Sequence, residues 1–136
     1  MAAAIADLLA QGRAIHLLSA ALCAGAMAAL LLAPGWRFAI GPAAVLLTGL
    51  AGTWAAIRVG FDARCFGRLA EPGGPDLIAF DATMVRLGLV PGEKVGRAIE
   101  ARIAGARRLL VIQGLLLVVQ VTIAASAALV AGWHAP

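Results

Sequence analysis

The sequence LLVIQGLLLVVQVTIAASAALVAG occupies residues 109–132 and contains no charged side chain. A helix needs about 20 consecutive apolar residues to cross the hydrocarbon layer of a bilayer, which is about 30 Å thick. This stretch exceeds that length, so a helix built from it would cross with some tilt. It therefore predicts a transmembrane helix.

Two further stretches, residues 14–33 and 38–57, contain no Asp, Glu, Lys or Arg, and only residues 34–37 separate them. The whole chain of 136 residues is 62% hydrophobic and 13% charged, whereas soluble domains average about 45–50% apolar and about 25% charged residues. We therefore predict an all-α, polytopic membrane protein. It forms a single membrane domain over residues 1–136, with transmembrane helices at about 14–33, 38–57 and 109–132.

The distribution of positive charge predicts the orientation. Of the 11 Lys and Arg residues, all except Arg37 lie before the first apolar stretch or between the second and third. The positive-inside rule then places the N-terminus and residues 58–108 in the cytoplasm and the C-terminus in the periplasm of a bacterial inner (plasma) membrane. The net charge of +4 reflects this bias, so the expected partner is the lipid bilayer and not nucleic acid.

Residues 58–108 are predicted to form a cytoplasmic, amphipathic helical insert. The second helix should continue to about Ala70, where a Pro/Gly-rich turn follows. A short amphipathic helix should begin near Asp76 and end at Gly88, and a further helix should run from Glu93 into the third span. Five arginines beside the spans are expected to contact lipid headgroups; these are Arg58, Arg64, Arg68, Arg107 and Arg108.

Small residues recur every four positions in the first two spans. Helices in lipid associate where small side chains let their backbones approach closely, so these two faces are predicted to meet across the short hairpin. The residues are Ala21, Gly25 and Ala29 in the first span, and Ala44, Thr48, Gly52 and Ala56 in the second.

The third span carries two amide side chains, Gln113 and Gln120, on one helical face. Polar groups inside a membrane need hydrogen-bond partners. Interhelical hydrogen bonds are therefore the main interpretation of this pair, and a substrate path is the alternative.

One group of side chains suggests metal chemistry. His16, Cys23 and Met27 lie on one stripe of the first helix, and imidazole, thiolate and thioether groups suit Cu(I). At a rise of about 1.5 Å per residue, Cys23 and Met27 are about 6 Å apart along the axis, and His16 is about 10 Å from Cys23. His16 would then be a separate copper-binding position, nearer the cytoplasm. The alternative interpretation is that these residues are ordinary packing groups in lipid.

The opening stretch RAIHLLSAALCAG, residues 13–25, resembles the first span of copper-resistance D-type (CopD-like) membrane proteins. Residues 47–50, LTGL, with Trp54 and Gly60, resemble the Thr-Gly-Leu span of the same family. The resemblance covers about residues 12–60, and Cys23 stands where the family has tryptophan. It implies an inner-membrane protein of copper uptake or tolerance, with His16 as a candidate copper contact.

Three functional hypotheses follow from the sequence. The first is a non-catalytic accessory or structural subunit that packs against itself, as a homo-oligomer, or against a larger membrane complex. The second is a copper-handling membrane protein. The third is haem binding through His16 with a second ligand from another copy, since no second histidine lies at matching depth. An enzyme is not expected, because the spans offer no convergent set of ionisable groups.

Overall fold

The computed structural model describes residues 2–32, 35–73, 77–88 and 99–133 of the chain. The described residues form five helices, and no strand occurs among them. The helices are α1 (Ala2–Ala10), α2 (Gly12–Leu32), α3 (Trp36–Ala70), α4 (Leu77–Arg86) and α5 (Ile99–Trp133).

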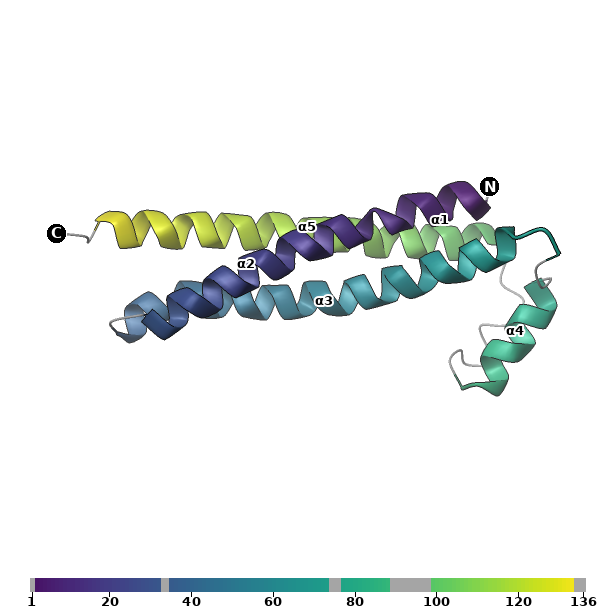
Figure 1. Cartoon of the computed structure of the whole chain (residues 1–136), viewed down its shortest axis with the longest axis horizontal. Helices are drawn as coiled ribbons and strands as arrows, with labels where there is room; N and C mark the ends of the chain where they lie inside the picture. Colours follow the sequence, from purple (N-terminus) through teal and green to yellow (C-terminus); the bar gives the residue numbers. More distant parts are fainter. Residues whose placement is uncertain (1, 33–34, 74–76, 89–98, 134–136) are drawn as a thin grey trace.

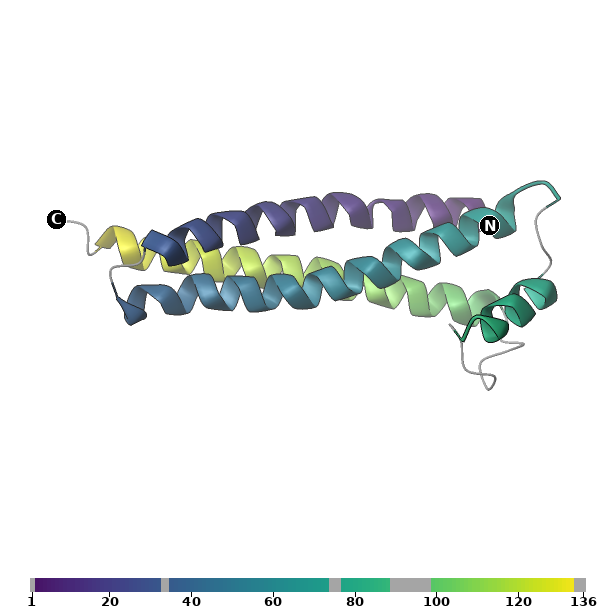
Figure 2. The same ribbon diagram turned by 60° about the horizontal axis from the view of Figure 1, so that its bottom comes forward.

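Helices α2, α3 and α5 lie side by side in an elongated bundle, and α4 lies off its end (Figures 1 and 2). Helices α2 and α5 run in the same direction, and α3 runs in the opposite direction between them in the chain. Three helical segments are long and apolar enough to cross a membrane: Ala3–Leu32, Trp36–Ala70 and Glu100–Gly132. The prediction of an all-helical protein with three long apolar helices is confirmed.

The helices are longer than a bilayer requires. Helices α3 and α5 contain 35 residues each, so each spans about 52 Å at 1.5 Å per residue. The hydrocarbon layer takes up only about 30 Å of that length. At one end of the bundle the remainder carries five exposed arginines, namely Arg58, Arg64 and Arg68 of α3 and Arg107 and Arg108 of α5, whereas Arg37 lies at the other end of α3. We call the end with these five arginines the arginine-bearing end.

The ends of α3 and α4 lie where the sequence predicts them. Helix α3 ends at Ala70, where the sequence analysis placed its end. Helix α4 occupies Leu77–Arg86 and is followed at Gly88 by a positive φ of 67°, a conformation that favours glycine. The predicted start of the last helix at Glu93 falls within residues 89–98, which lie outside the described residues.

An apolar core lies in the arginine-bearing end. Leu9 of α1, Val59 and Phe66 of α3, and Ala106 of α5 are each at most 4% exposed and pack together. No helix was predicted for residues 2–10, yet α1 supplies a residue of this core. Burial of apolar surface contributes about 25 cal/mol per Å² to stability. This cluster therefore stabilises the contact between α1, α3 and α5 outside the uncharged stretches.

The chain bends between α1 and α2. Gln11 N–H donates to Leu8 C=O at 3.3 Å, and Ala14 N–H donates to Gln11 C=O at 3.0 Å, so shorter-range turn bonds replace the helical pattern here. At Gly12, the Gln113 side chain donates to the backbone carbonyl at 2.7 Å. Glycine together with a side chain inserted at the helix backbone is a recognised cause of helix kinks.

Candidate functional site

The interior of the bundle contains a polar layer centred on Gln120, which is 1% exposed. Ser19 Oγ donates to Gln120 Oε1 at 2.7 Å. Gln120 Nε2 lies 3.3 Å from Ser19 C=O, 3.3 Å from Val45 C=O and 3.2 Å from Cys23 Sγ, all of which can accept from it. This one amide therefore joins α5 to both α2 and α3.

Gly49 makes room for the Gln120 side chain. A Cβ at Gly49 would lie 2.8 Å from Gln120 Nε2 and would overlap Cys23 Sγ. Any larger residue would therefore displace the amide or the thiol. The close approach of α3 to the other two helices depends on glycine at this position.

A second polar layer lies one heptad away, towards the arginine-bearing end. Gln113 is 2% exposed, and its Nε2 donates to Gly12 C=O at 2.7 Å. A Cβ at Gly12 would meet Val59 Cγ1 at 2.9 Å and Gln113 Oε1 at 3.0 Å. Both layers join residues 101 positions apart, so α2 and α5 pair in a parallel seven-residue register, as in a coiled coil.

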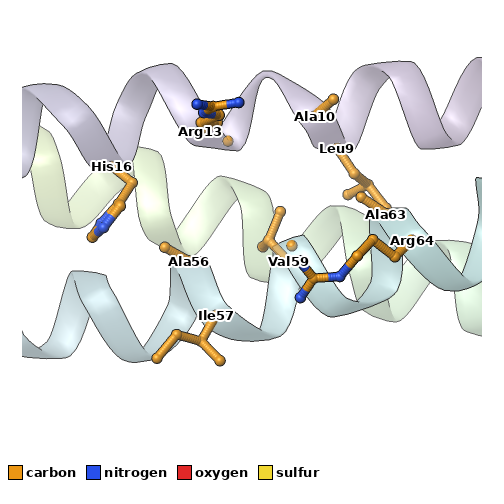
Figure 3. Close-up of a pocket in the computed structure, with 11 residues that line it drawn as sticks. Leu9, Ala10, Arg13, His16, Ala56, Ile57, Val59, Ala63 and Arg64 are labelled. Atoms are coloured by element: carbon orange, nitrogen blue, oxygen red, sulfur yellow. The ribbon is translucent and has the colours of Figure 1, made fainter.

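A pocket of about 400 Å³ lies between the α1–α2 segment and α3 (Figure 3). Its wall is mostly apolar and includes Leu9, Ala56 and Val59. Three basic side chains also line it, which are Arg13 and His16 of α2 and Arg64 of α3. The pocket thus combines an apolar wall with positive charge.

Two buried polar atoms near these layers have no hydrogen-bond partner among the described residues. They are His16 Nδ1 and Gln113 Oε1. Leaving a buried polar group unpaired costs about 1–3 kcal/mol, so each atom marks a place where a further partner would be stabilising. His16 projects into the space between α2 and α3 in Figure 3.

The predicted metal residues occupy different surroundings. His16 and Cys23 are half-buried, and Cys23 Sγ accepts a hydrogen bond from Gln120. Met27 is 47% exposed. Among the described residues, no group of three or more His, Cys, Asp or Glu side chains is placed to hold a metal ion.

Helix α2 packs against the other helices through a different face from the one predicted. Ala21, Gly25 and Ala29 are exposed, and a Cβ added at Gly25 would meet no atom within 4 Å. Helix α2 instead buries Gly12, Ser19 and Ala26. The predicted contact of the first small-residue face with α3 is therefore corrected. The parallel pairing with α5 selects the face that carries Ser19, because this hydroxyl bonds to Gln120.

The remaining predicted residues lie at or beside the interhelical contacts. Of the small residues in α3, Gly52 is buried, and the others are half-buried; these are Ala44, Thr48 and Ala56. The five arginines predicted to contact lipid headgroups are all exposed. Their exposure leaves the guanidinium groups accessible to phosphate.

Sequence reasoning missed Ser19, Gly12 and Gly49 as parts of the polar layers. A signal was present, because Gly12, Ser19 and Ala26 repeat at the same interval as Gln113, Gln120 and Ala127. It also missed Arg13 and Arg64 as neighbours, since they come from separate helices. Comparison of the chain with protein-family models, curated proteins and solved structures gives no match.

Proposed function

We propose that the chain is a small integral protein of the bacterial inner membrane with a non-catalytic accessory or structural role, in a homo-oligomer or a larger membrane complex. Three long apolar helices support the membrane placement. The bundle interior is occupied by side chains that bond to one another, such as Gln120 and Ser19. This arrangement suits a scaffold that holds a fixed shape.

One observation carries the proposal: the small-residue face of α2 is left uncovered by the helices that the structure describes. Ala21, Gly25 and Ala29 are exposed, and space is open above Gly25. A helix of another subunit can approach the backbone closely along such a face, which is how helices associate in lipid.

The test is a bulky substitution on this face. Gly25→Leu should abolish association, measured by crosslinking in native membranes and by single-molecule photobleaching in lipid. Ala24→Leu is the matched control, because Ala24 is also exposed but lies about 100° around the helix. A wild-type chain that is monomeric in both assays, or equal effects of the two substitutions, would contradict the proposal.

The proposed orientation puts the N-terminus and the arginine-bearing end in the cytoplasm. It is supported by the exposed arginines, which lie on α3 and α5 beyond the uncharged stretches. A reporter enzyme inserted after Gly88 should be active only if it is a cytoplasmic reporter. Activity of a periplasmic reporter at this position would overturn the orientation.

Copper handling through His16, Cys23 and Met27 is the alternative proposal. It is supported by the unpaired Nδ1 of His16, since a neutral imidazole nitrogen is a suitable ligand for copper. A competition titration with a Cu(I) chelator, comparing wild type with the triple alanine variant, decides it. Equal Cu(I) affinity in both proteins would rule out this site.

A further inference from the structure

The pocket beside α2 lies where the uncharged stretches of the helices meet the arginine-bearing end. Its apolar wall includes Ala56 and Ile57, which end the uncharged stretch 38–57. Arg13 directly precedes the uncharged stretch 14–33, and Arg64 lies further into the arginine-bearing end. The pocket therefore extends from the apolar part of the bundle to its charged part.

The basic groups of the pocket come from two helices. In Figure 3, Arg64 extends back along α3 towards Val59, and His16 projects from α2 towards α3. Arg13 lies on α2 between His16 and the end of α1. Both arginines are exposed, so their guanidinium groups are accessible to a ligand, and arginine binds phosphate oxygens with up to two parallel hydrogen bonds.

His16 supplies a second, independent observation. Its Nδ1 is buried and has no partner among the described residues, while the residue lines the pocket. An imidazole whose Nδ1 carries a proton can donate a hydrogen bond to an anionic oxygen. An anion in the pocket would face the two arginines, and a rotation of the imidazole would turn this buried nitrogen towards it.

We propose that this pocket binds the phosphate headgroup of an anionic phospholipid, with Arg13, Arg64 and His16 around the phosphate and the first part of one acyl chain on the wall at Ala56 and Ile57. The mostly apolar wall favours a lipid over free phosphate, because inorganic phosphate would bury no apolar surface there. The inference rests on the membrane placement of the proposed function but not on self-association.

The experiment is native mass spectrometry of the full-length protein in detergent micelles, with phosphatidylglycerol or phosphatidylcholine added. Wild type should bind one phosphatidylglycerol in preference to phosphatidylcholine. The variant Arg13→Gln/Arg64→Gln should bind phosphatidylglycerol about 30-fold more weakly, which is about 2 kcal/mol at roughly 1 kcal/mol for each arginine near an anionic lipid.

The matched control is Arg68→Gln/Arg107→Gln, which removes the same charge from two exposed arginines of α3 and α5 that do not line the pocket. It should leave the first bound lipid almost unchanged. A further variant, Ala56→Leu, narrows the pocket without altering charge and should also weaken binding. Far-UV circular dichroism establishes that each variant retains its helices.

Three results would overturn the proposal. The first is equal loss of phosphatidylglycerol binding in the pocket variant and the control variant, which would indicate general surface electrostatics. The second is equal binding of the two lipids by wild type. The third is displacement of the bound lipid by millimolar inorganic phosphate, which would indicate a free-phosphate site. None of these readouts depends on the association measured with Gly25→Leu, so the two proposals fail separately.

Discussion

Replacing Gln120 by methionine should destabilise the bundle by about 2 kcal/mol, because the new side chain fills a similar volume but cannot hydrogen-bond. The Gln120 amide accepts one hydrogen bond from Ser19 and has two N–H groups to share among the acceptors on Ser19, Cys23 and Val45. At most three bonds form at once. Interhelical hydrogen bonds in membranes contribute about 0.6 kcal/mol each, so their loss amounts to about 1.8 kcal/mol.

The partners of Gln120 limit this cost. After the substitution, the Ser19 hydroxyl can bond to a carbonyl one turn earlier in α2, as serine does within helices. The Val45 carbonyl belongs to the helical part of α3, so it keeps a backbone partner. The expected loss therefore stays near the sum of the bonds and does not include a large penalty for stranded groups.

The assay is equilibrium unfolding in mixed micelles of dodecyl maltoside and sodium dodecyl sulfate, followed by tryptophan fluorescence and far-UV circular dichroism. Ser126→Ala is the control, because Ser126 is an exposed polar residue of the same helix. A double-mutant cycle of Gln120→Met with Ser19→Ala should give a coupling energy of about 0.6 kcal/mol, with about 1.7 kcal/mol as the upper limit. If Gln120→Met unfolds at the same denaturant fraction as wild type, or if the coupling energy is zero, the interpretation of the polar layer is refuted.

Two further substitutions test the packing in the polar layer and in the arginine-bearing end. Gly49→Ala should be about 1–3 kcal/mol less stable than Gly60→Ala in the same unfolding assay, because a Cβ at Gly49 overlaps Cys23 Sγ whereas one at Gly60 meets nothing within 4 Å; equal stability would show that the thiol and amide move aside freely. Leu9→Ala should cost about 2–5 kcal/mol of local stability, because Leu9 is 1% exposed in the apolar core. It should therefore speed amide hydrogen exchange in α1, whereas Leu8→Ala, at a residue 37% exposed, should not. Unchanged exchange in Leu9→Ala would mean that α1 does not depend on this core.

The helices that can cross a membrane were predictable because apolar length and charge are properties of contiguous sequence. The end of α3 at Ala70 was predictable for the same reason, since a Pro/Gly cluster follows it. Helix α1 was missed because the charged Arg13 was taken as the border of the first span, and the residues before it were not assigned to an element. Its burial depends on Phe66 and Ala106, which are distant in the chain.

The packing face of α2 could not be read from small residues alone. The stripe at Gly25 offered close backbone approach, but the face that α2 buries carries Ser19, because a hydrogen bond to Gln120 is available only there. Choosing between the two faces requires knowledge that α5 runs parallel to α2. The pocket could not be predicted from the sequence for a similar reason, since Arg13 and Arg64 line the same pocket only when α2 and α3 are antiparallel.

The pairing of Ser19 with Gln120 also constrains how the protein is made. The serine is synthesised 101 residues before its partner. The hairpin of α2 and α3 therefore leaves the ribosome and enters the bilayer before the Gln120 amide is in place. The bundle is complete only when α5 has packed against this hairpin. A chain that stops before α5 would lack this interhelical bond and would leave the inner side of the hairpin uncovered.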